Sequence, residues 1–191
     1  MRLQLRVLLP FLFLCALLVY PAPATTETFD MAVSPEVGFR LPAYGTVIQF
    51  SETLYCDSWE WDGLNATYIK FNHVKMDGDT LDYFLISAQG ANITVEDLMV
   101  LRTVRLTAQI PSGTLGTIML QVPTAYGMPS SITIGGTTYT SPVPTRDGFD
   151  KATYDCWYYD STVGLIYIKA LGHSPTEIAV SWQLSGGGGG G

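Results

Sequence analysis

Short runs of alternating apolar and polar residues, separated by turn residues, dominate this chain. Thr67–Val74 (TYIKFNHV) and the run that begins at Asp79 (DTLDYFLIS) flank the dipeptide Asp77-Gly78. Asp-Gly favours the two-residue turns that join neighbouring antiparallel strands, so this stretch predicts a β-hairpin. Ser131–Thr140 repeats the pattern around Gly135-Gly136 and predicts a second hairpin.

The remaining runs also predict strands rather than helices. Met99–Ile110 alternates branched apolar with polar residues, and Thr117–Val122 forms a shorter run. Only Val95–Leu98 could begin a helical turn, and it is too short for a stable helix. Short strands separated by Gly, Pro, Asn and Asp are typical of two packed sheets. The pattern therefore predicts an all-β, antiparallel β-sandwich, immunoglobulin-like or jelly-roll-like, formed as a single domain by residues 25–184.

Aromatic residues concentrate in Asp155–Ala170 (DCWYYDSTVGLIYIKA). Side chains alternate along a strand, so Cys156 and Tyr158 face one way while Trp157 and Tyr159 face the other. If the cysteine side is the core, Trp157 and Tyr159 face outward. Either a loop or the N-terminal segment covers them, or they form a surface on which sugars stack.

A second aromatic pair, Trp59 and Trp61, follows Cys56 closely. On a strand both indoles share one face with Glu60 on the other, and such a pair beside a cysteine favours a core position. On a loop, the same pair could form a carbohydrate-binding tip. These four aromatic residues, Trp59, Trp61, Trp157 and Tyr159, are the candidate ligand-binding residues.

The N-terminal sequence predicts export from the cell. Two arginines precede an apolar run, Val7–Val19, and small residues end the segment at Ala24, which is the arrangement of a cleaved signal peptide covering residues 1–24. The apolar run is shorter than the roughly 20 residues that a membrane-spanning helix needs, so we expect no span in the mature chain. At the other end, residues 185–191 (SGGGGGG) predict a flexible tail.

Charge argues against several classes of partner. Without Arg2 and Arg6 the mature chain has 8 basic and 17 acidic residues, a net charge of −9. Such a surface disfavours nucleic acid and anionic lipid.

Export also bears on the cysteines and on two glycosylation motifs. Removal of the signal leaves Cys56 and Cys156, and an oxidising compartment predicts a disulfide between them. Asn65-Ala66-Thr67 and Asn92-Ile93-Thr94 match the acceptor motif for N-glycosylation, which predicts that Asn65 and Asn92 lie at the surface.

Evidence for catalysis or metal binding is weak. The two histidines, His73 and His173, are too few for a histidine-rich metal site, and no nucleophile motif of the GxSxG kind is present. The aspartates at 77, 79 and 82 lack the spacing of a calcium loop and suit a hairpin turn. We therefore expect no catalytic residues, no metal and no cofactor.

Two pieces carry a resemblance to a known family. Val122–Gly136 and Trp157–Trp182 resemble the closing half of immunoglobulin-like β-sandwich modules in large secreted and cell-surface proteins, particularly of archaea. That resemblance implies a non-catalytic module, often found beside carbohydrate-active domains. It assigns no functional residue.

Taken together, these features predict a secreted, extracellular or cell-surface module that works by binding or adhesion, with a glycan or a protein as partner. One alternative is a filament subunit that self-associates by donating Thr28–Val33 (TFDMAV), whose Phe29, Met31 and Val33 share one side. We expect this segment to pair within its own chain instead. The other alternative is a carbohydrate-active enzyme.

Overall fold

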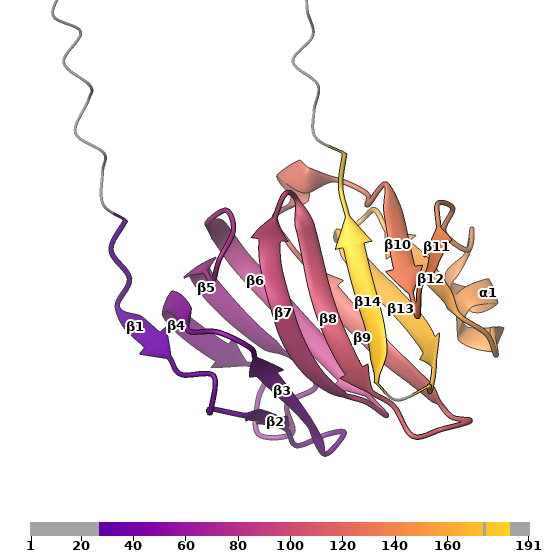
Figure 1. Cartoon of the computed structure of the whole chain (residues 1–191), viewed down its shortest axis with the longest axis horizontal. Helices are drawn as coiled ribbons and strands as arrows, with labels where there is room; N and C mark the ends of the chain where they lie inside the picture. Colours follow the sequence, from indigo (N-terminus) through magenta and orange to yellow (C-terminus); the bar gives the residue numbers. More distant parts are fainter. Residues whose placement is uncertain (1–26, 174, 184–191) are drawn as a thin grey trace, which may run out of the picture.

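The computed structural model describes residues 27–173 and 175–183, and their strands form two packed sheets (Figure 1). Sheet A contains, in spatial order, β1 (Met31–Val33), β4 (Leu54–Trp61), β5 (Ile69–Lys75), β6 (Leu81–Gln89), β9 (Leu115–Gln121), β13 (Leu165–Leu171) and β12 (Cys156–Asp160). Sheet B contains β11 (Thr137–Tyr139), β10 (Ser131–Ile134), β14 (Thr176–Ser181), β8 (Thr103–Gln109), β7 (Asn92–Val100), β3 (Thr46–Phe50) and β2 (Phe39–Leu41). Neighbouring strands pair antiparallel except β3 and β7, which are parallel. The predicted all-β sandwich is confirmed.

The signal-peptide and glycine-tail predictions, residues 1–24 and 185–191, lie outside the described residues. Within the described residues, no helix is long and apolar enough to cross a membrane.

Both predicted hairpins are present. β5 and β6 are joined by the five residues 76–80, so the connection that contains Asp77-Gly78 is longer than the predicted two-residue turn. β10 and β11 are joined through Gly135 and Gly136, which both have positive φ. Met99–Ile110, predicted as one run, instead spans the end of β7, a tight turn and β8. Leu101 and Arg102 form that turn with φ of 49° and 57°. Leucine and arginine rarely adopt positive φ, so the sequence does not predict a turn at these positions. Val95–Leu98 belongs to β7 and not to a helix.

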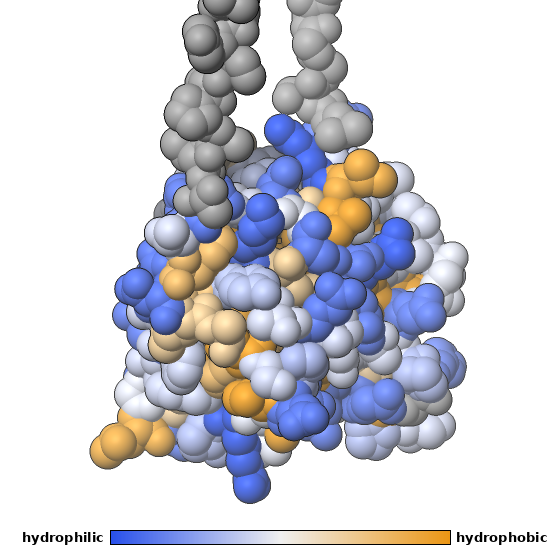
Figure 2. All heavy atoms as spheres, turned by 60° about the vertical axis from the view of Figure 1, so that its left-hand side comes forward, coloured by the Kyte–Doolittle hydropathy of each residue, from blue (hydrophilic) through white to orange (hydrophobic). Residues whose placement is uncertain are grey.

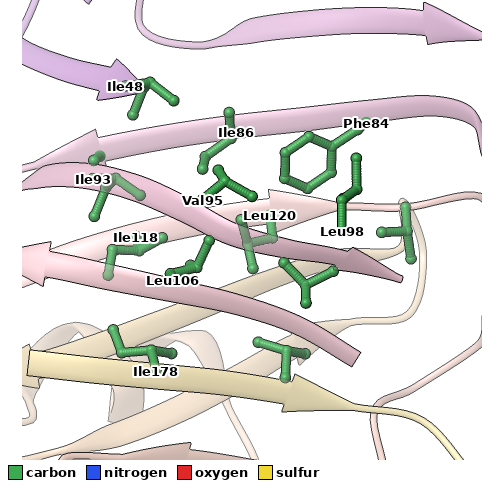
Figure 3. Close-up of a cluster of buried hydrophobic side chains, with 14 of the residues drawn as sticks. Ile48, Phe84, Ile86, Ile93, Val95, Leu98, Leu106, Ile118, Leu120 and Ile178 are labelled. Carbon is green, nitrogen blue, oxygen red and sulfur yellow. The ribbon is translucent and has the colours of Figure 1, made fainter. Parts of the chain in front are cut away.

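The core lies between the two sheets. Figure 3 shows branched side chains from β3, β7, β8 and β14 meeting others from β6 and β9, all within a single buried cluster. Ile93, Val95 and Leu106 from sheet B face Phe84 and Ile118 from sheet A. Apolar side chains that alternate along each strand bury one face of each sheet. Because only the outer face of each sheet meets water, the chain has a low proportion of charged residues.

The chain also contains two short helices, η1 (Thr124–Tyr126) and α1 (Arg146–Lys151). Thr145 caps α1 by accepting a hydrogen bond from the Gly148 amide at 3.1 Å. At the other end of α1, Lys169 of β13 donates hydrogen bonds to the carbonyls of Phe149, Asp150 and Ala152 at 2.6, 2.7 and 3.0 Å. These bonds satisfy carbonyl groups that a helix end leaves free. Helix α1 therefore covers the outer face of sheet A over β12 and β13.

Candidate functional site

Trp59 and Trp61 lie on the last part of β4, where the edge of sheet A faces the edge of sheet B. Both indoles pack on Phe39 of β2, with ring centroids 5.5 and 6.2 Å from its ring. Phe39 is buried and packs edge-on against Phe50 and Phe71 in the core. Each tryptophan keeps 39% of its surface exposed. Trp59, Trp61 and the Phe39 beneath them are called the tryptophan rim below.

An irregularity in the strands turns the two indoles toward Phe39. Cys56 is buried in the core, and strict alternation would place Ser58 on the same face and both tryptophans outside. In the structure the alternation changes between Cys56 and Trp59. On the paired strand β5, His73 has a φ of 45° and its Nδ1 lies 2.9 Å from Asp57 Oδ2. The two indoles therefore face Phe39 of sheet B because both paired strands change face together.

Polar contacts hold the surroundings of the rim in place. On the opposite face of β4, Glu60 forms an ion pair with Lys70 of β5 at 2.9 Å. In the loop between β4 and β5, the Asp62 carboxylate accepts hydrogen bonds from the hydroxyl and the amide of Thr67. The rim thus lies on a paired strand followed by a tethered loop.

Exposed apolar side chains lie in the segments next to the rim. Val37 precedes β2, Tyr44 lies in the turn between β2 and β3, and Leu64 lies in the loop after β4. The last two segments meet where the Ala43 amide donates to the Ala66 carbonyl at 3.2 Å. Figure 2, which brings this side of the molecule forward, shows the hydrophobic residues as small groups between hydrophilic ones. This side of the molecule is therefore largely hydrophilic and exposes small groups of apolar side chains.

The prediction that Trp157 and Tyr159 face away from Cys156 is correct, but the two faces were assigned the wrong way round. Trp157 is 1% exposed and belongs to the main core, with Tyr159 packed against it. Cys156 and Tyr158 lie on the outer face, where Phe149 of α1 covers them. Trp157 therefore packs in the cluster of core residues that both sheets form. An exposed Trp157–Tyr159 surface for sugar stacking is therefore ruled out by burial.

The predicted disulfide between Cys56 and Cys156 is wrong, because both cysteines are free and buried. β4 and β12 are the second and seventh strands of sheet A, which puts the two residues on the order of 24 Å apart at the usual strand spacing. The thiols also lie on opposite faces, one in the main core and one under α1. A disulfide needs Cα atoms closer than about 7 Å.

The two glycosylation motifs differ in their surroundings. Asn65 and Asn92 are both exposed, as the prediction required. Asn92 Oδ1 accepts a hydrogen bond from the Val47 amide at 2.9 Å, so this side chain links β7 to β3. Asn65 lies in the loop that Asp62 and Thr67 tether. Whether either residue carries a glycan stays a prediction.

The remaining polar candidates have structural partners. Asp77 Oδ1 accepts from the Leu98 amide at 3.0 Å, as suits a residue of a turn. His73 stacks on Phe29, with ring centroids 4.9 Å apart, and among the described residues no hydroxyl or thiol hydrogen-bonds to its ring. In the same part of the chain, no three His, Cys, Asp or Glu side chains gather as metal ligands would.

Comparison with protein-family models, with curated proteins and with solved structures finds no match for this chain. The two-sheet architecture agrees with a β-sandwich, while the immunoglobulin-like resemblance rests on the two sequence pieces alone. Each sheet also has seven strands among the described residues. The two sheets together therefore have more strands than the seven to nine of an entire immunoglobulin domain.

Sequence reasoning found the tryptophans of the rim but missed two features that matter to it. Phe39, which supports both indoles, lies in a strand of only three residues. Three residues are too few for an alternating pattern that would predict a strand. The free edge of β4 was also missed. β1 pairs only with Leu54–Cys56, so Asp57–Trp61 has β5 on one side and, within residues 27–173 and 175–183, no strand on the other.

Proposed function

We propose that this chain is a non-catalytic binding module, exported from the cell, that holds glycans against the tryptophan rim. The observation that carries the proposal is the pair of half-exposed indoles packed on a buried phenylalanine. An indole that is fixed in place offers a large flat apolar face at little entropic cost, and its N–H can hydrogen-bond at the edge of a ligand. These are the properties that stacking on the C–H face of a sugar ring requires.

The spacing of the rim suits an extended ligand. Trp59 and Trp61 are two residues apart on one strand, which separates them by about 6.5 Å along β4. Two adjacent stacking positions can contact successive parts of a chain of sugars, and contacts made at several positions raise the overall affinity. The net negative charge of the mature chain favours neutral over acidic glycans.

A glycan array, followed by calorimetry with the best ligand, tests this proposal. Trp59→Ala and Trp61→Ala should each weaken binding about tenfold or more, because hot-spot contacts of this kind are worth at least 1.4 kcal/mol. Tyr55→Ala is the matched control, since Tyr55 lies on the same strand and is 42% exposed but belongs to the outer face. An equal loss in Tyr55→Ala, or no glycan retained by the unmodified protein, would contradict the proposal.

A second candidate function, assembly by strand addition, is favoured by the free edge of β4. β1 pairs with its own chain, which accounts for Met31–Val33 and argues against donation of this segment. Phe29, just before β1, does not pair along β4 but packs over the outer face of sheet A on Tyr55 and His73. The stretch Asp57–Trp61 therefore remains open to a strand from another molecule.

Size-exclusion chromatography with light scattering on the mature chain separates the two candidates. A binding module gives a monomer whose size does not change with concentration. A concentration-dependent series of polymers favours strand addition instead. Deletion of residues 28–33 sharpens the result, because it lengthens the free edge of β4 and should increase association if that edge accepts strands.

A further inference from the structure

A hollow lies at the far edge of the sandwich from the tryptophan rim, where β11, β12 and the segments on either side of α1 come together (Figure 1). Its volume is about 400 Å³, which falls within the range of small-molecule sites. Its lining combines an apolar wall with two tyrosines and one carboxylate: Pro142, Val143, Leu171, Tyr139, Tyr154 and Asp155. The hollow shares no residue with the rim and can therefore be considered for a ligand of its own.

Asp155 gives the hollow a fixed negative charge. Its Oδ1 accepts a hydrogen bond from the Leu171 amide at 2.6 Å, which holds the carboxylate beside the apolar wall. Among residues 27–173 and 175–183, no arginine, lysine or histidine forms an ion pair with it. Lys169, two positions from Leu171 on β13, donates its ammonium N–H groups to three carbonyls at the end of α1 instead. The carboxylate is therefore free to attract a positively charged ligand.

Two tyrosines of the lining offer aromatic rings to such a ligand. Tyr139 is half-buried on β11 and packs against the core, and Tyr154 is 59% exposed. Burial raises the pKa of the Tyr139 phenol, and the neighbouring Asp155 and Cys156 raise it further. The Tyr139 hydroxyl therefore lies within the electrostatic reach of the carboxylate. The face of an aromatic ring attracts cations, so the rings and the carboxylate favour the same kind of ligand.

The rest of the wall indicates what kind of cation fits. The side chains of Pro142, Val143 and Leu171 have no hydrogen-bond acceptor. A primary ammonium has three N–H donors, which lose water partners on entering such a wall without finding enough new ones. A quaternary ammonium has alkyl groups in place of these donors, and alkyl groups gain from contact with apolar side chains. The net charge of −9 on the mature chain favours cations in general.

We propose that this hollow binds a quaternary ammonium group, as in choline. The positively charged group would lie against the rings of Tyr139 and Tyr154, and Asp155 would balance its charge. Its methyl groups would contact Pro142 and Leu171. Aromatic rings are the usual means by which proteins recognise this cation. The proposal does not depend on the glycan binding proposed at the rim.

Choline is the probe, and its matched control is dimethylbutanol, the uncharged alcohol in which carbon replaces the nitrogen of choline. Calorimetry on the mature chain should give choline about tenfold or more higher affinity than this alcohol. It should also favour choline about fivefold or more over ethanolamine, a primary ammonium of similar length. Absence of choline binding, or equal binding of choline and the uncharged alcohol, would overturn the proposal. Equal binding of ethanolamine would overturn the assignment to a quaternary group.

Variants of the lining test whether the cation binds in this hollow. Asp155→Asn keeps an oxygen for the Leu171 amide and removes the charge, so the fold should persist while choline binding weakens about fivefold or more. Tyr154 is exposed, so Tyr154→Leu should leave thermal stability unchanged and still weaken binding, whereas Tyr154→Phe keeps the ring and should retain it. A loss of choline binding in Trp59→Ala, with none in Asp155→Asn or Tyr154→Leu, would assign the cation to the tryptophan rim and overturn the site.

Phosphatidylcholine vesicles decide where the ammonium group comes from. Sedimentation of the protein with these vesicles, lost in Asp155→Asn, would support the site and place the group on a lipid headgroup. Binding of free choline without sedimentation would support the site with a soluble ligand. Failure of all these probes at the hollow would overturn this proposal and leave the glycan-array result at the rim unaffected.

Discussion

β4 and β12 carry similar short sequences and use them in opposite ways. Each has a buried cysteine followed closely by aromatic residues, Trp59 and Trp61 in one case and Trp157, Tyr158 and Tyr159 in the other. In β12 the strand alternates regularly, so Cys156 faces outward under α1 and Trp157 enters the core. In β4 the cysteine enters the core, and the change of face near Asp57 turns the tryptophans inward as well.

The difference shows that one backbone irregularity decides what a pair of aromatic residues can do. Trp157 is buried in the core, whereas Trp59 and Trp61 pack on Phe39 and stay half-exposed. The same residue type thus stabilises the fold at one edge and, under the proposed function, offers a binding surface at the other. Burial, and not residue type, separates the two roles.

The largest expected effect is at Trp157. Trp157→Ala should lower the free energy of unfolding by about 3 to 5 kcal/mol, because it empties a sealed site in the core. Urea denaturation followed by circular dichroism measures this loss. Trp157→Phe should cost clearly less because an aromatic ring still fills most of the site. If Trp157→Ala proved as stable as the unmodified protein, Trp157 would not be a core residue.

Much of the fold was accessible from sequence because local chemistry determines it. Asp77-Gly78 and Gly135-Gly136 predicted two hairpins that the structure contains. Gly135 and Gly136 have the positive φ that few other residues adopt, whereas Gly78 is needed because a Cβ there would lie 2.3 Å from the Met99 backbone. Leu101 and Arg102 make a comparable turn with positive φ and no glycine, so tertiary pairing of β7 with β8 imposes it. Helix α1 has a Thr145 cap, but six residues give no helical period to detect.

The site was less accessible because its orientation depends on long-range pairing. The sequence identified Trp59 and Trp61 as candidates, yet the face they occupy follows from the conformation of His73, on a different strand. The supposed disulfide made the cysteine side of β12 look like the core, and this single assumption reversed both faces there. The strand order places Cys56 and Cys156 at opposite sides of sheet A. The spacing of two cysteines along the sequence cannot predict that order.

The cysteines provide the next largest effect. Cys56→Ser places a hydroxyl in the main core and should cost about 1 to 3 kcal/mol of stability. Cys156→Ser should cost less, because Cys156 lies in the small cluster under α1. Thiol titration checks the premise: without reductant, two thiols per mature chain should react after denaturation and almost none before it. A chain with no reactive thiols after denaturation would restore the disulfide.

The rim tryptophans should affect stability less than Trp157 does. Trp59→Ala should cost about 1 to 2 kcal/mol, since water reaches the site and no closed cavity remains. Phe39→Leu tests the support beneath the indoles. It should leave Trp59 and Trp61 in place on the strand but loosen their packing, which a red shift in tryptophan fluorescence would report. A Trp59→Ala loss as large as that of Trp157→Ala would mean that the two edges are buried alike.

The smallest effect is a difference in pH dependence between the two cysteines. Burial raises the pKa of the Cys56 thiol and the nearby Asp57 charge raises it further. Burial also raises the pKa of Cys156, but the positive charge of Lys169 opposes that change, and the negative charge of Asp155 adds to it more weakly. A thiol whose pKa is higher in the folded state stabilises the fold fully below its unfolded pKa. This contribution is lost as the pH rises through the folded value.

Stability should therefore decline between about pH 8 and pH 10, as thiols in the unfolded chain ionise near their ordinary pKa. Cys56→Ala should flatten this decline more than Cys156→Ala, because both influences on Cys56 act in the same direction. Urea midpoints measured across this pH range for the three proteins give the comparison, with the pH 7 values as reference. If Cys156→Ala flattened the curve as much, Lys169 would not act on that thiol and would serve only to cap α1.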